Sequence, residues 1–184
     1  IYSERRQVLL GADISENIKG MIKSVIERNV MTYVGDNAEF PENWDLVGLN
    51  ETLMPMLNIS KIEITEEDKE SLKPEELVER VYEKALKVYA EKEEEVTSER
   101  MREIERVILL KVIDQRWMDH IDDMDQMRQG ISLRAYAQRD PITEYKFISY
   151  DMFEELSTNI QTETVRGLFN IRLVDPNMER KPVV

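Results

Sequence analysis

His120 is the only histidine of this chain, and it stands in a cluster of aspartates, so it is the first residue to consider for metal binding or proton transfer. The aspartates are Asp119, Asp122, Asp123 and Asp125. On a helix, His120 and Asp123 would lie on adjacent turns and could hold a metal ion together. No third ligand is obvious, and the spacing lacks the central glycine and terminal glutamate of a calcium loop. Two interpretations follow: a weak metal site in a metal-dependent enzyme, or a hydrogen-bonded histidine near Trp117 on a solvated acidic face.

A second candidate is segment 129–141, Gln-Gly-Ile-Ser-Leu-Arg-Ala-Tyr-Ala-Gln-Arg-Asp-Pro, which lies between two long helical patterns. It carries Arg134 and Arg139 against Asp140 alone, and Tyr136 stands near its middle. An aromatic ring offers apolar area with a hydroxyl group, and arginines meet carbonyl and acidic groups. A cationic, aromatic segment of this kind suits contact with a partner. The alternative is an ordinary exposed loop in which Tyr136 folds back over the helix ends.

Motifs for other kinds of chemistry are missing from the sequence. It has no Gly-x-x-x-x-Gly-Lys-Ser/Thr phosphate loop, no Gly-x-Gly-x-x-Gly and no Gly-x-Ser-x-Gly. Without cysteine it has neither disulfides nor thiolate metal sites, and with one histidine a nucleophile–base pair is hard to build. We therefore expect the chain as given to be non-catalytic, without a metal or cofactor of its own.

The charge balance argues against nucleic acid as the main partner. The net charge is −13 over 184 residues, whereas sequence-independent binding of nucleic acid depends on neutralising phosphates with Lys and Arg. Most of the acidity lies in block 36–97, which has 18 acidic and seven basic residues. No apolar run approaches the ~20 residues of a membrane-spanning helix, and no signal peptide is visible. The opening Ile1-Tyr2-Ser3, without Met, indicates a piece of a longer protein.

The elements that would position these residues are helical. Six glycines, six prolines and 34% charged residues favour long helices with a large wetted surface. Apolar residues spaced by three and four predict a helix over 1–34, with a kink near Gly11 and the Asp13–Ser15 step. Block 36–73 is irregular, and we expect short helices around 42–46 and 49–57, then an extended piece over 59–64. Thr65 and Pro74 mark further helix starts.

Two apolar stripes of similar length flank segment 129–141 and predict a pair of helices. The first is Leu110, Ile113, Trp117, Ile121, Met124, Met127 and Ile131, and the second is Tyr145, Ile148, Met152, Leu156 and Ile160. At roughly 30 residues each, the helices would be about 45 Å long and would pack antiparallel. Asp140 and Pro141 form a clear start for the second helix. The predicted fold is all-α, with a hairpin over 98–173, a tip loop at 129–141 and a tail or linker at 174–184.

These residues carry a resemblance to the SecA family. The run Leu-Leu-Lys-Val-Ile-Asp-Gln-Arg-Trp-Met-Asp-His-Ile at 109–121 resembles the SecA pattern of Leu-Leu, Asp, Trp and His in a long helix. Segment 124–141 is similar to the SecA fingertip, and Glu144-Tyr145-Lys146 and Met152-Phe153 continue the match. Residues 1–6 resemble the long scaffold helix, and Trp44-Asp45 fits the start of the wing. The resemblance implies the end of the long scaffold helix at 1–34, a helical wing at 35–97 and a two-helix finger at 98–173.

SecA is the ATP-driven motor of bacterial protein export, and the resemblance implies a part in that process. In the family the finger enters the cytoplasmic mouth of the SecY channel, and its loop touches the translocating polypeptide. The fingertip residues implied here are Tyr136, Arg134, Arg139, Leu133 and Ile131. The finger also restrains the nucleotide-binding domains, which hold ATP and Mg and are absent from this chain.

The implied partners are the SecY channel complex, unfolded preprotein, the parent's own nucleotide-binding domains and a second copy in a homodimer. The implied location is cytoplasmic, peripheral at the cytoplasmic face of the bacterial inner membrane. The residues alone leave another function open, that of a free-standing α-helical chaperone or adaptor for unfolded clients.

Overall fold

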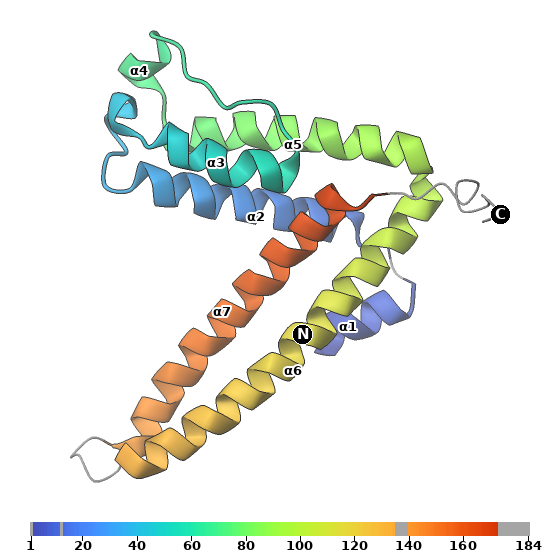
Figure 1. The fold of residues 1–184 in the computed structure, drawn as a ribbon, viewed down its shortest axis with the longest axis vertical. Coiled ribbons are helices and arrows are strands. Elements are labelled where there is room, and N and C mark those ends of the chain that lie inside the picture. The colour runs from blue at the N-terminus through green and yellow to red at the C-terminus, as the bar shows by residue number, and fades with distance from the viewer. Residues whose placement is uncertain (1, 12, 135–139, 173–184) are drawn as a thin grey trace, which may run out of the picture.

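The computed structural model describes residues 2–11, 13–134 and 140–172, and within these ranges it contains helices and no strand (Figure 1). This confirms the all-α prediction. The helices in chain order are α1 (Tyr2–Leu9), α2 (Ser15–Val34), the 3₁₀ helix η1 (Pro41–Asn43), α3 (Leu46–Leu57), α4 (Asp68–Ser71), α5 (Pro74–Val96), α6 (Ser98–Arg134) and α7 (Pro141–Asn170).

The helical run expected over residues 1–34 is divided between α1 and α2, where the sequence predicted only a kink. Gly11 has a φ of +79°, a left-handed conformation that glycine adopts without steric cost. The Asp13 carboxylate accepts a hydrogen bond from the Ser15 backbone N–H at 2.9 Å, which occupies a free donor at the start of α2. The two helices then differ in their main neighbours: α1 packs against α6, whereas α2 packs mainly against α3, α5 and α7.

The main core lies around α2, which packs against both α3 and α5 (Figure 1). The predicted stripe of α2 faces this core, and Ile18, Ile22, Val25 and Ile26 are fully buried. Each side chain of this kind stabilises the fold by about 1.5–3 kcal/mol relative to an exposed one. The irregular block 36–73 is held to the same core. Its helices η1 and α3 correspond to those expected at 42–46 and 49–57, although η1 ends at Asn43 and α3 already begins at Leu46.

Helices α6 and α7 form the predicted antiparallel hairpin, which projects away from α2, α3 and α5 (Figure 1). The chain enters α6 at a sharp corner, where Thr97 has a φ of +78° and its carbonyl accepts from the Met101 N–H at 3.0 Å. With 37 and 30 residues, α6 and α7 are about 55 and 45 Å long. Helix α6 continues to Arg134, beyond the expected start of the tip at 129. Gly130 weakens a helix by only about 1 kcal/mol relative to alanine, which is too little to end it.

The C-terminal end of α7, at the base of the hairpin, is held to the helices around the core by polar contacts. The Lys92 amine of α5 donates to the carbonyl of Phe169, and the Asn58 amide donates to the same carbonyl at 2.6 Å. Asn170 in turn donates to the Met56 carbonyl at 3.0 Å. The last carbonyls of a helix lack partners within the helix and carry partial negative charge, so a lysine there is favourable. The base of the hairpin is therefore joined to both α3 and α5.

Candidate functional site at the hairpin

The tip of the hairpin is only partly within the described residues. Tyr136 and Arg139 lie outside them, and Leu133 and Arg134 belong to the last turn of α6. Ile131 lies one turn earlier and is buried, with 8% of its surface exposed. The roles of these five residues in contacting a partner stay predictions.

The start of α7 has the predicted cap. The Asp140 carboxylate accepts from the Ile142 N–H at 3.3 Å and from the Thr143 hydroxyl at 2.6 Å. The hydrogen bond from Thr143, followed by that from Ile142, lowers the pKa of Asp140. An ionised aspartate at this position also interacts favourably with the helix dipole. The return helix of the hairpin therefore begins at a well-defined point, directly after the tip.

Large apolar side chains are exposed along the distal half of the hairpin. Phe147 and Tyr150 of α7 are 70% and 65% exposed, and Met118 of α6 is 65% exposed. Phe147 and Tyr150 are three residues apart, so their side chains share one face of α7. Sequence reasoning missed both residues because they lie off the interhelical stripe. The signal that could have found them is the presence of aromatic rings at positions where a solvated helix usually carries polar side chains.

His120 lies between two aromatic rings in the middle of the hairpin. Its ring centroid is 5.6 Å from that of Trp117 and 6.4 Å from that of Phe153 across the hairpin. A hollow of about 80 Å³ beside it is lined by His120, Arg116, Asp119 and Asp123, together with residues of α7. Within the described ranges no group of three or more His, Cys, Asp or Glu residues could hold a metal ion. Trp117 packs against the core cluster, as its place in the predicted apolar stripe indicated, whereas Met118 is exposed.

An ion pair links α6 and α7 one helical turn closer to the base of the hairpin than His120. The Arg116 guanidinium donates to both carboxylate oxygens of Glu163, and its Nε lies 2.9 Å from Glu163 Oε2. A two-pronged arginine–carboxylate contact fixes orientation as well as distance. The hydrogen bond to Glu163 raises the pKa of Arg116. This contact fixes the position of α6 along α7 at a point between the base and the tip.

A buried carboxylate, Glu105, lies at the root of α6. Its side chain is fully buried, and Arg102 Nη2 approaches it to 3.1 Å without the alignment of a hydrogen bond. The same nitrogen is 3.1 Å from Glu93, and the Arg102 guanidinium is 3.9 Å from Asp13. Burial, and then the charge of Asp13, raises the pKa of Glu105 to about 7. Arg102 is thus close to three carboxylates: Asp13 of the α1–α2 link, Glu93 of α5 and Glu105 of α6. The sequence did not predict this cluster.

Comparisons with known proteins point to one family. The SecA Wing and Scaffold domain family matches residues 1–172. The protein translocase subunit SecA 1 of Clostridioides difficile is 49% identical over 185 residues, covering 100% of this chain and 20% of that protein. The protein translocase subunit SecA of Desulforamulus reducens is 44% identical over 180 residues, covering 96% of this chain and 20% of that protein.

The chain spans about a fifth of the length of these curated relatives. Among the helices of the described residues, none is both long and apolar enough to cross a membrane. The family match extends from α1 through the end of α7, so the helices that carry the core and the hairpin are all included. The chain therefore belongs to the SecA family, and it corresponds to the wing and scaffold region of that family.

Proposed function

We propose that this chain is the non-catalytic scaffold, wing and finger region of a protein-export motor, and that its hairpin pushes on the translocating polypeptide. The observation that carries the proposal is the hairpin itself, two braced helices of about 55 and 45 Å that extend away from the core. The relatives are named as protein translocase subunits, which supports a part in moving polypeptides.

The tip must contact preproteins of many different sequences. In this proposal Tyr136 contacts the unfolded preprotein, with Arg134 and Arg139 beside it and Leu133 and Ile131 behind. A ring with a hydroxyl group makes contacts that do not depend on sequence, since every polypeptide offers apolar area and backbone amides. The exposed rings of Phe147 and Tyr150 then face the wall of the SecY channel, where aromatic side chains lose their contact with water.

The base of the hairpin transmits movement between the tip and the motor domains. Helices resist bending because their packing is dense, so displacement of the tip moves the base. The contacts of Lys92 and Asn58 with the end of α7 carry that movement into the wing. ATP and Mg bind in the parent's nucleotide-binding domains, and this region acts at the cytoplasmic face of the inner membrane. The proposal favours the motor over a free-standing adaptor because the family match covers the whole hairpin and wing.

Site-specific photocrosslinking in the full-length motor tests this proposal. A photoreactive phenylalanine analogue at Tyr136 should crosslink to a preprotein that is arrested during export, and one at Phe147 should crosslink to the channel. The same analogue at Phe40, an exposed ring outside the hairpin, is the control and should give neither product. Tyr136→Ala should slow export while leaving ATP binding unchanged. If Tyr136→Ala exports at the normal rate and position 136 does not crosslink to preprotein, the fingertip role is wrong.

A further inference from the structure

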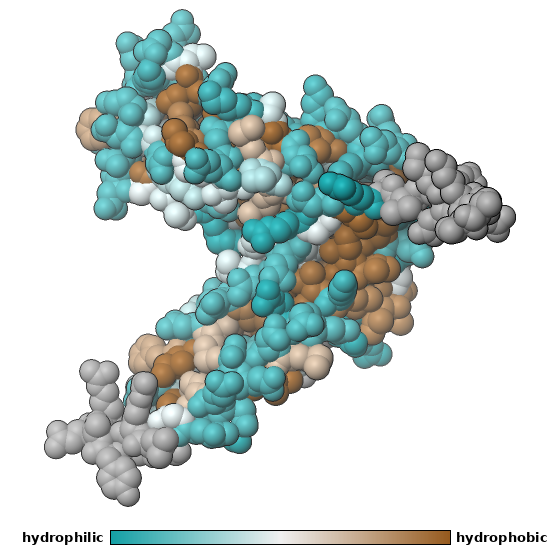
Figure 2. All heavy atoms as spheres, in the orientation of Figure 1, coloured by the Kyte–Doolittle hydropathy of each residue, from teal (hydrophilic) through white to brown (hydrophobic). Residues whose placement is uncertain are grey.

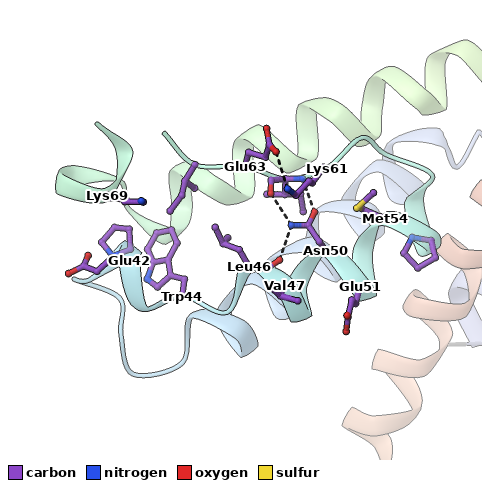
Figure 3. Close-up of a pocket in the computed structure, with 14 residues that line it drawn as sticks. Glu42, Trp44, Leu46, Val47, Asn50, Glu51, Met54, Lys61, Glu63 and Lys69 are labelled. Atoms are coloured by element: carbon purple, nitrogen blue, oxygen red, sulfur yellow. Dashed lines mark hydrogen bonds and ion pairs between the residues drawn. The ribbon is translucent and has the colours of Figure 1, made fainter. Parts of the chain in front are cut away.

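A groove in the wing has no part in the hairpin function proposed above (Figure 3). It lies between α3 and the extended segment 61–64, with η1 and α4 at one end, and its volume is about 740 Å³. Ligand pockets typically measure ~300–1,000 Å³. In the space-filling view, hydrophobic atoms gather between α3 and α4 with hydrophilic atoms around them (Figure 2). The groove is therefore large enough to take several side chains of a partner.

The walls of the groove are fixed by hydrogen bonds. The buried amide of Asn50 donates to the Leu46 and Ile62 carbonyls at 2.8 and 2.9 Å and accepts from the Ile62 N–H at 2.7 Å (Figure 3). The Trp44 indole N–H donates to the Asn37 carbonyl at 2.7 Å, which holds the ring at one end. A groove that is already formed loses little conformational entropy when it is filled. The shape is therefore suited to binding without rearrangement.

The lining of the groove is mainly apolar, and part of it remains in contact with water. Six of the apolar residues are Trp44, Leu46, Val47, Met54, Ile62 and Ile64. Val47 is 71% exposed although its side chain lies on the wall of the groove. Covering exposed apolar surface stabilises a complex by roughly 25 cal/mol per Å² of area removed from water. An occupant of this groove must therefore offer bulky apolar side chains.

The charges at the rim of the groove indicate the charge of its occupant. Lys61 pairs with Glu63 at 3.1 Å, and Lys69 pairs with Glu66, so both lysines of the lining are neutralised locally. The carboxylates of Glu42 and Glu51 have no hydrogen bond or ion pair with any described residue, and both are exposed. Both belong to block 36–97, whose net charge is −11. The electrostatic complement of this rim is a basic partner.

We propose that the wing groove binds a polypeptide segment in which bulky apolar side chains are flanked by lysine or arginine. The apolar side chains enter the groove between α3 and segment 61–64, against Val47 and Met54. The flanking cations meet Glu42 and Glu51 at the rim. The hairpin tip takes no part in this binding, so the groove and the fingertip can be tested separately.

Fluorescence anisotropy with a labelled synthetic peptide, Lys-Lys-Leu-Phe-Leu-Leu-Lys-Lys, tests the proposal on the 184-residue chain. Val47→Asp places a charge on the apolar wall, and Glu51→Lys reverses a charge of the rim. Each should weaken binding about tenfold or more. Val107→Asp on α6 and Glu83→Lys on α5 make the same changes at exposed positions outside the groove, and both should bind like the parent chain. Circular dichroism melting of all four variants confirms that each is folded.

Two further peptides separate groove binding from simple charge attraction. A peptide with glutamates in place of the lysines should bind about tenfold more weakly, and so should one with serines in place of the apolar residues. Equal binding of the serine peptide would overturn the proposal, as would an absence of binding or an equal loss in the control variants. Concentration-dependent dimers in sedimentation that Val47→Asp abolishes would also overturn it, because the groove would then serve a second copy of the chain.

Discussion

Replacing Glu105 by glutamine tests whether the root of the hairpin holds a carboxyl group that binds a proton near neutral pH. Burial, together with the charge of Asp13, raises the pKa of Glu105 from 4.5 to about 7. The single positive charge of Arg102 is shared between Asp13, Glu93 and Glu105, so it compensates the buried carboxylate only in part. Removing a carboxylate from water without full compensation favours its neutral form.

The sign and size of the effect follow from proton linkage. The pKa of Glu105 is higher in the folded chain than in the unfolded chain, so the folded state binds the proton more tightly. Its contribution to stability is therefore fully present below about pH 4.5 and is lost as the pH rises to about 7. Between pH 5 and pH 8 this loss amounts to roughly 2–3 kcal/mol. Glutamine has a similar volume and cannot ionise, so the stability of Glu105→Gln does not fall with pH for this reason.

Urea unfolding followed by circular dichroism, at steps from pH 5 to pH 8, measures the prediction. The free energy of unfolding of Glu105→Gln minus that of the parent chain should rise by roughly 2–3 kcal/mol over this range. Glu103→Gln, an exposed position on the same helix, is the matched control for the loss of a carboxyl group. A flat or falling difference for Glu105→Gln would mean that Arg102 keeps Glu105 ionised in the folded chain, and the reasoning would be refuted.

Three further predictions concern the wing. Asn50→Ala should lower the free energy of unfolding by about 3 kcal/mol in urea titrations, because it leaves the buried N–H and carbonyl of Ile62 without their partner. Gly48→Ala should cost about 1–3 kcal/mol in the same assay, since a Cβ there would lie 2.5 Å from a tyrosine ring of α2. Arg80 donates two hydrogen bonds to Asp68 and lowers its pKa, so Arg80→Ala should raise that pKa toward the ordinary value in a carbon-13 NMR titration. The stability that this pair contributes is present above the ordinary aspartate pKa and is lost on acidification, so the deficit of the Arg80→Ala variant should shrink as the pH falls.

The sequence alone predicted the hairpin and most of the helices, but not the break between α1 and α2. A stripe with helical spacing reports the buried face of one helix, and the predicted stripe of α2 is buried. In the hairpin the stripes join the buried core only near the base, through Ile113, Leu156 and Ile160. Further out, Ile121 is 51% and Tyr145 is 37% exposed, because only α6 and α7 meet there in the described part of the chain. Asp140 and Pro141 marked the start of α7 because capping depends on neighbours in the chain. The family resemblance likewise rests on residues that can be read in order, and the family match confirms it.

The tertiary structure decided which off-stripe side chains are buried and which surfaces are left open. Glu105 is buried because the α1–α2 link, α5 and α6 meet around it, and no local pattern reports that meeting. The wing groove exists because Asn50 holds a segment twelve residues away at a set distance from α3. Phe147 and Tyr150 stay exposed because among the described residues no helix packs over that face of α7. Periodicity describes the faces of one helix, whereas burial depends on which other elements reach those faces, and that is settled only when the whole chain is packed.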